Sequence, residues 1–263
     1  MAEITSVPAA SVAGMIFSLI LSIGLPIGLL IYLRSRTGAR ISAFLIGGAS
    51  FFLSAMVLEQ LLHAAVLAAA GDALTGNIWL YALYGGLAAG LFEETGRYVA
   101  MKFCMKKQLT RQSALMYGAG HGGIEAVLIL GLASINNLSA VALVNSGGFE
   151  SFLSSLSAEE SDALIQAFSA LWSTPSWQFF LGGIERILAV ALHISLSVLV
   201  YRAVRDRRIS FYLLAVGLHV LVDSAALAAS RFLSPILVEA LVLLLTALTG
   251  ALAVRLYREA PAD

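Results

Sequence analysis

Cysteine and charged residues are both scarce in this chain, and each scarcity excludes a class of protein. The 263 residues include a single cysteine, Cys104, so no disulfide can form within the chain. Only 12% of the residues are charged, whereas 59% are hydrophobic and the mean hydropathy is +0.89. Soluble globular domains carry about 25% charged residues. The composition therefore excludes a soluble globular protein and predicts a membrane protein with several spanning helices.

Other common features are also missing. Residues 1–11 lack the basic flank of a signal peptide, so we expect the first apolar run to stay in the membrane as a span. No soluble domain, internal repeat or low-complexity tract stands out, and nothing indicates a nucleic-acid partner. We therefore expect residues 1–263 to form one transmembrane domain embedded in the lipid bilayer.

Long apolar runs define the predicted spans. Crossing about 30 Å of hydrocarbon takes roughly 20 apolar residues in a helix. The runs that meet this length are approximately 11–33, 41–70, 78–101, 112–136, 176–201, 209–230 and 235–257. The predicted fold is all-α: a polytopic helical bundle with about seven transmembrane helices.

Basic residues follow every second predicted span. The segments that follow the first, third, fifth and seventh spans contain thirteen of the 16 Lys and Arg: Arg34, Arg36, Arg40, Lys102, Lys106, Lys107, Arg111, Arg202, Arg205, Arg207, Arg208, Arg255 and Arg258. Arg231 alone falls on the opposite side. The positive-inside rule then places the N-terminus outside and the C-terminus in the cytoplasm. We expect a multi-pass protein of a bacterial or archaeal plasma membrane.

One long segment, residues 137–175, falls on the outer side and is acidic. Ser157 and Glu160 have the spacing of a capping box, which predicts a helix start. Apolar residues follow at helical spacing: Leu164, Ile165, Phe168, Leu171 and Trp172. We interpret 137–175 as an outer loop with an amphipathic helix on the outer leaflet. A short helix folded back over the bundle is the alternative.

The third predicted span contains Glu93, Glu94 and Arg97. A charge in the hydrocarbon costs roughly 2.5–3.5 kcal/mol on insertion scales, so a sequence that retains three charges is expected to use them. Arg97 lies four residues after Glu93 and three after Glu94. It can neutralise the pair and support the helix, or hold one carboxylate while the other acts.

Four ionisable groups on four predicted spans share one depth. Glu93, His121, His193 and His219 lie nine to eleven residues from the basic ends of their spans, which is roughly 13–17 Å. Such groups usually face the bundle interior or a water-filled cavity. The shared depth predicts a common site.

A second tier lies about one turn further out. Glu125 is four residues after His121 and Asp223 is four after His219, so each carboxylate can accept the second N–H of its histidine. Four glycines lie near His121 in the sequence: Gly118, Gly120, Gly122 and Gly123. Their lack of side chains either lets helices pack closely or leaves room for a substrate strand.

Two further groups lie near the outer ends of their spans. They are Glu59 with His63, and Glu185 with Arg186. We interpret both as local pairs or interface groups.

Glutamate and histidine in a wet cavity suit water activation. A glutamate can take a proton from water and return it to a leaving amine. Histidines can stabilise an oxyanion or hold a zinc ion. A zinc ion could be bound by His121, His193 and His219 together with a glutamate. A metal-free mechanism would use the same residues, so the sequence leaves the zinc-dependent and the metal-free mechanism open.

Three motifs occur in order along the chain: Glu93-Glu94-x-x-Arg97, Tyr117-x-x-x-His121 and His219-x-x-x-Asp223. This ordered set resembles the CAAX-protease and abortive-infectivity superfamily of intramembrane proteases. The chain is most similar to the YhfC-type membrane peptidase family, through Phe-Glu-Glu-Thr-Gly-Arg-Tyr (92–98), Gly-His-Gly-Gly-Ile-Glu (120–125) and the added His193 helix. The resemblance covers about spans two to six.

The resemblance implies that the glutamate pair supplies the general base, and that His121 and His219 form the water or oxyanion site. Asp223 takes the family's Asn/Asp position. In the CAAX enzymes three residues separate the glutamate pair from the arginine; here only Thr95 and Gly96 do, which puts prenyl-cysteine substrates in doubt. A related scaffold subunit of gamma-secretase keeps the histidines without catalysis, whereas this chain retains both glutamates.

We predict an intramembrane peptidase that hydrolyses a membrane protein or peptide substrate with Glu- and His-activated water. The residues assigned to catalysis are Glu93, Glu94, Arg97, His121, Glu125, His219 and Asp223. The candidate metal ligands are His121, His193 and His219. A non-catalytic scaffold subunit and a proton-coupled transporter are the alternatives, although the transporter would be expected to show an inverted repeat or broken helices.

Overall fold

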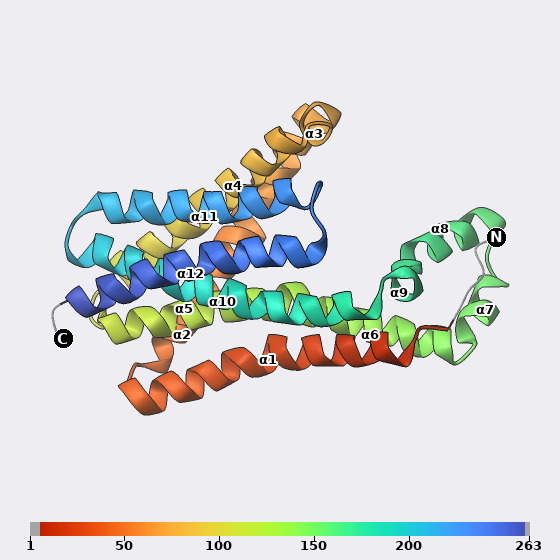
Figure 1. The fold of residues 1–263 in the computed structure, drawn as a ribbon, viewed down its shortest axis with the longest axis horizontal. Helices are drawn as coiled ribbons and strands as arrows, with labels where there is room; N and C mark the ends of the chain where they lie inside the picture. Colours follow the sequence, from red (N-terminus) through yellow and green to blue (C-terminus); the bar gives the residue numbers. More distant parts are fainter. Residues whose placement is uncertain (1–5, 261–263) are drawn as a thin grey trace. The chain divides into compact units, whose positions relative to one another are not determined.

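The computed structural model describes residues 6–260, which are helical over most of their length and contain no strand (Figure 1). The α-helices are α1 (Ala9–Thr37), α2 (Ile41–Phe51), α3 (Gln60–Thr75), α4 (Ile78–Val99), α5 (Arg111–Ala126), α6 (Leu132–Asn145), α7 (Gly148–Leu153), α8 (Ala158–Phe168), α9 (Ala170–Ser173), α10 (Ser176–Arg205), α11 (Ile209–Ala229) and α12 (Pro235–Glu259). Three π-helical segments continue α2, α4 and α5: η1 (Phe52–Glu59), η2 (Ala100–Cys104) and η3 (Val127–Gly131). The all-α prediction is confirmed.

Six helical stretches in the described part are long and apolar enough to cross a membrane. They are Ala9–Thr37, Ile41–Thr75, Arg111–Asn145, Ser176–Arg205, Ile209–Ala229 and Pro235–Glu259. The remaining predicted span corresponds to α4, which has 22 residues but carries Glu93, Glu94 and Arg97. The chain is thus an integral, multi-pass membrane protein, while the count of seven spans and the orientation of the termini stay predictions.

The chain divides into two compact units. Unit 1 comprises the described residues up to Gly24 together with Ala126–Arg186, and unit 2 comprises Leu25–Glu125 with the described residues from Ile187 onward. Every residue of the predicted site belongs to unit 2.

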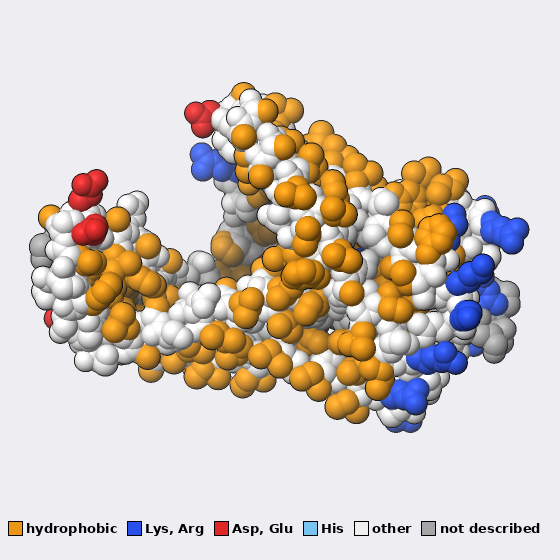
Figure 2. All heavy atoms as spheres, turned by 180° about the vertical axis from the view of Figure 1, so that it is seen from behind, with side chains coloured by type: hydrophobic (Ala, Val, Ile, Leu, Met, Phe, Trp, Pro, Cys, Tyr) orange, Lys and Arg blue, Asp and Glu red, His pale blue; other side chains and the backbone are white. Residues whose placement is uncertain are grey.

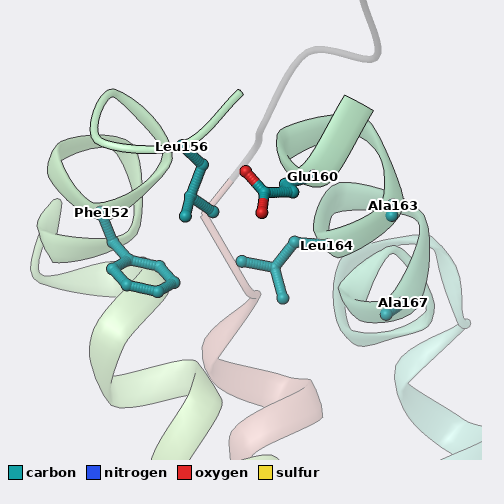
Figure 3. Close-up of a pocket in the computed structure, with 6 residues that line it drawn as sticks. All are labelled: Phe152, Leu156, Glu160, Ala163, Leu164 and Ala167. Atoms are coloured by element: carbon teal, nitrogen blue, oxygen red, sulfur yellow. The ribbon is translucent and has the colours of Figure 1, made fainter. Parts of the chain in front are cut away.

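Unit 1 contains the segment predicted as an outer loop. Helix α6 continues to Asn145, past the predicted end of its span at 136. Helix α8 begins at the predicted capping box: the Glu160 N–H donates to Ser157 Oγ at 3.3 Å, and the Ser157 N–H donates to Glu160 Oε2 at 3.0 Å. A hollow of about 400 Å³ is lined by residues from α7 to α8, and Figure 3 shows that Phe152 and Leu164 lie on opposite sides of it. The placement of α8 on the outer leaflet remains a prediction.

Unit 2 is built around α4, which lies alongside α11 (Figure 1). Its core includes Tyr117, Leu196, Leu199 and Tyr201, all fully buried. Most basic side chains visible in Figure 2 gather at one end of this unit, while apolar side chains cover the flanks of its helices. This distribution agrees with the positional pattern of Lys and Arg in the sequence.

Candidate functional site

The two adjacent glutamates of α4 have different partners. Successive helical residues are about 100° apart around the axis, so the two side chains point in different directions. Glu93 Oε2 is 2.9 Å from His121 Nε2 on α5. Glu94 Oε1 is 2.9 Å from His219 Nδ1 on α11. Both glutamates are buried, so α4 connects two histidines through two consecutive carboxylates.

Arg97 is fully buried and joins α4 to α10. Its Nε is 3.2 Å from Glu94 Oε2. Its Nη1 donates to the His193 carbonyl oxygen at 2.6 Å and to Ser197 Oγ at 2.7 Å, and its Nη2 donates to His193 Nδ1 at 2.9 Å. Arg97 therefore holds Glu94, whereas Glu93 contacts His121.

The tautomer of His193 follows from these contacts. A guanidinium offers only donors, so Nδ1 of His193 is the acceptor and the proton lies on Nε2. His193 Nε2 is 2.5 Å from Glu125 Oε2. Glu125 therefore pairs with His193 across two helices, not with His121 on its own helix as expected. The N–H of His193 Nε2 needs an acceptor and finds it in Glu125, whereas His121 contacts Glu93 through Nε2 and its buried Nδ1 has no hydrogen-bond partner among the described residues.

His219 lies between two carboxylates. Its Nδ1 faces Glu94, and its Nε2 is 3.4 Å from Asp223 Oδ2, as the spacing predicted. A histidine that donates from both nitrogens is an imidazolium. The Asp223 side chain is 38% exposed, whereas that of His219 is 3% exposed. Asp223 therefore marks the edge at which the buried cluster meets its surroundings.

The three histidines come together in one layer. The ring centroids of His121 and His193 are 4.8 Å apart, and those of His193 and His219 are 5.4 Å apart. The shared depth of Glu93 and these histidines thus corresponds to real contact.

Glycines make this proximity possible. A Cβ placed on Gly118 would lie 2.5 Å from Ile194 Cα, and one on Gly122 would lie 3.0 Å from Val190 Cα. The backbone of α5 therefore reaches α10 without an intervening side chain. This supports close packing as the role of these two glycines.

One subset of the cluster fits a metal ion. Ligand atoms of Glu93, His121 and His193 all lie within 4.8 Å of one another, and Glu93 Oε2 is 3.9 Å from His193 Nδ1. Two histidines and a glutamate form a common catalytic zinc donor set. This subset contains Glu93 in place of His219, which the sequence had grouped with His121 and His193. His193 Nδ1 also accepts from Arg97, so a bound cation would compete with the guanidinium for this nitrogen.

Charge in the cluster also favours a cation. The cluster contains one guanidinium, that of Arg97, and four carboxylates, which contact Arg97 or one of the histidines: Glu93, Glu94, Glu125 and Asp223. Even with an imidazolium at His219, negative charges remain in excess. Uncompensated charge is costly in a buried site, so a divalent cation or bound protons would be needed for balance.

The outer groups form local pairs, as predicted. His63 Nε2 is 3.2 Å from Glu59 Oε1, and His63 Nδ1 is 2.7 Å from Tyr84 Oη. Glu59 also lies close enough to His219 and Asp223 to interact electrostatically. In unit 1, Arg186 pairs with its neighbour Glu185.

Sequence reasoning missed Ser197 and Tyr84. Both are uncharged, so neither carries the membrane cost that marked the other residues. Only their positions in the sequence could have indicated them: Ser197 is four residues after His193, and Tyr84 is near the start of the span that contains the glutamate pair.

The fold and the site together define an all-helical, multi-pass membrane protein with buried, paired glutamates and histidines. The sequence model of the YhfC intramembrane metalloprotease family matches residues 21–243, and the chain belongs to this family. It is 42% identical over 210 residues to the "Uncharacterized membrane protein YhfC" of Bacillus subtilis (strain 168), an alignment that covers 79% of this chain and 80% of the relative. No solved structure gives a significant match.

Proposed function

We propose that this chain is a zinc-dependent intramembrane peptidase that hydrolyses peptide bonds of a membrane protein or peptide substrate. The observation that carries the proposal is the buried donor group of Glu93, His121 and His193, with Glu94 beside it. The family's name supports the reaction class. On the basis of its motifs we also propose that the chain belongs to the wider CAAX-protease superfamily, and on the basis of its basic segments that it lies in a bacterial or archaeal plasma membrane.

Glu93, His121 and His193 would hold the ion. When bound, zinc acts as a Lewis acid and lowers the pKa of a coordinated water to about 7. Glu125 fixes the tautomer of His193 through Nε2, so that Nδ1 faces the donor group. Glu125 is thus a positioning residue.

Glu94 is the remaining buried carboxylate next to this group. We assign to it the transfer of a proton from water to the leaving amine. Arg97 and His219 hold its two oxygens at 3.2 and 2.9 Å, which keeps the carboxylate oriented. The sequence motif assigns the base to the glutamate pair as a whole, and we prefer Glu94 because Glu93 belongs to the donor group.

His219 carries positive charge in this arrangement. Glu94 and Asp223 take both of its N–H groups, so its imidazolium would stabilise the oxyanion of a tetrahedral intermediate through its positive charge and not through a hydrogen bond. Asp223 orients His219 and lies at the exposed edge of the cluster, where a substrate segment would enter.

A matched pair of variants tests the proposal. Wild type, Glu93→Gln and Glu94→Gln are purified in detergent without chelator, and their metal content is measured by mass spectrometry. We expect about one zinc per chain in the wild type and Glu94→Gln, and much less in Glu93→Gln. His219→Ala should retain zinc, because His219 lies outside the donor group. Zinc lost from His219→Ala but kept by Glu93→Gln would overturn the ligand assignment.

Turnover is tested on total membrane proteins from cells that lack this gene. New N-termini are identified by mass spectrometry after incubation with each variant. We expect Glu94→Gln to reduce cleavage by about 10²–10⁴-fold. Wild-type protein that holds zinc but produces no new N-termini, or the same ones as Glu94→Gln, would favour a non-catalytic scaffold.

A further inference from the structure

An apolar groove lies on the side of α4 that faces away from the glutamate pair. It has a volume of about 650 Å³ and is bounded by α2 and η1 on one side and by α4 and η2 on the other. Its lining includes Ile46, Leu53, Leu58, Leu91, Val99 and Cys104. The α4 residues that line it alternate with those of the catalytic cluster, so at 3.6 residues per turn the two sets occupy opposite faces. The groove is therefore separate from the proposed reaction site.

Two π-helical segments border this groove. Leu53 and Leu58 belong to η1, and Cys104 ends η2. π-Helical turns are rare and occur frequently at functional sites. Two of them on opposite walls of one groove indicate that the groove is a built feature of the fold.

A polar hollow of about 350 Å³ adjoins the same two chain segments. It is lined by Arg40 and Lys107, with Gln108, Thr110 and Ser113 among its polar residues. Arg40 directly precedes α2, and Lys107 follows Cys104 by three residues. Ser42 Oγ donates to Gln108 Oε1 at 2.7 Å and so ties the two segments together. The six residues from Arg40 to Ile46 span about 9 Å, which places the basic hollow near the end of the groove.

We propose that the two hollows bind one anionic phospholipid. Its phosphate lies in the polar hollow with Arg40 and Lys107, and one acyl chain lies in the apolar groove. The volume of the groove is within the roughly 300–1,000 Å³ usual for small-molecule sites. Basic pockets between membrane helices select anionic headgroups. This inference is independent of the proposed peptidase activity.

Lipid retention in native mass spectrometry tests this site. The purified protein is mixed with equal amounts of phosphatidylglycerol and phosphatidylcholine. The detergent is then removed in the gas phase, and the number of lipid molecules of each kind that stay bound to the protein is measured. We expect one retained phosphatidylglycerol. The double variant Arg40→Gln/Lys107→Gln should lower its retention about tenfold. Arg36→Gln/Arg258→Gln, which removes two exposed charges outside the hollow, is the matched control and should retain the lipid.

A second pair of variants tests the groove itself. Ala49 is exposed and lines the groove, so Ala49→Phe should fill it and abolish retention; Leu61→Phe, on an exposed face outside the groove, should not. The rate of Cys104 alkylation gives an independent readout, because a bound chain covers this single thiol. We expect added phosphatidylglycerol to slow alkylation in wild type but not in Ala49→Phe. Equal retention of both lipids, or retention that Ala49→Phe leaves unchanged, would overturn the proposal.

Discussion

In unit 1 two glutamates contact residues close to them in sequence: Glu160 contacts Ser157, and Glu185 contacts Arg186. Around the glutamate pair of unit 2, the partners are far apart. His121 and Glu93 are 28 residues apart, Arg97 and His193 are 96 apart, and His219 and Glu94 are 125 apart. Local pairs can form as soon as a helix turn forms, whereas the long-range pairs require the assembled bundle. The first kind acts within one helix, as in the capping box at the start of α8, and we infer that the second kind defines the site.

Removal of Arg97 should have the largest effect on stability. Arg97→Gln leaves the buried Glu94 carboxylate without its cation, and breaking a buried ion pair in this way costs about 3–5 kcal/mol. Unfolding in detergent, followed by circular dichroism, measures the loss. Arg255→Gln is the control, because Arg255 pairs with Glu259 at 2.9 Å with both side chains half or more exposed. We expect no measurable change for the control. Similar losses in the two variants would contradict the special role of the buried pair.

Glycine substitutions should have an intermediate effect. Gly118→Ala places a Cβ against Ile194 and forces α5 away from α10, at a cost of about 1–3 kcal/mol. The shift should also separate His121 from His193 and reduce zinc content. Gly217→Ala has open space around the new Cβ and should be neutral or stabilising, because alanine favours a helix. Equal effects at the two positions would mean that close approach is not what Gly118 provides.

The capping box of α8 should have the smallest effect. Hydrogen bonds from the hydroxyl and backbone N–H of Ser157 lower the pKa of the Glu160 carboxyl. A group with a lowered folded pKa contributes stability above its unfolded pKa, about 4.3, and loses the contribution as the pH falls through the folded value. Glu160→Gln should therefore speed amide exchange in the first turn of α8 at neutral pH. The difference from wild type should shrink in acid; a difference that grows in acid would contradict this account.

Much of the site was predictable because charge in a membrane is costly. Glu93, Glu94, Arg97 and the three histidines stood out for that reason, and counting from the basic ends placed four of these groups at one depth. The pairing of His219 with Asp223 followed from their spacing on one helix. The family resemblance was confirmed by the match to the YhfC family.

The partners between helices were not predictable. Spacing reveals neighbours on one helix only, so Glu125 was expected with His121 rather than with His193. The rotation of each helix about its axis decides such pairs, and packing at Gly118 and Gly122 sets that rotation. The three π-helical segments were also missed, because the sequence pattern assumes 3.6 residues per turn throughout.

The π-helical segment η1 has a consequence for comparison with relatives. A π-turn holds one more residue than an α-turn, so it acts as an insertion absorbed within a continuous helix. The start and the end of η1 present different faces: Ser50 and Leu53, just before and near its start, line the groove, whereas Glu59 at its end is buried beside His63. A relative that lacks one residue between positions 52 and 59 should form an ordinary α-helix there. Its counterpart of Glu59 would then be turned about 100° from the position seen here.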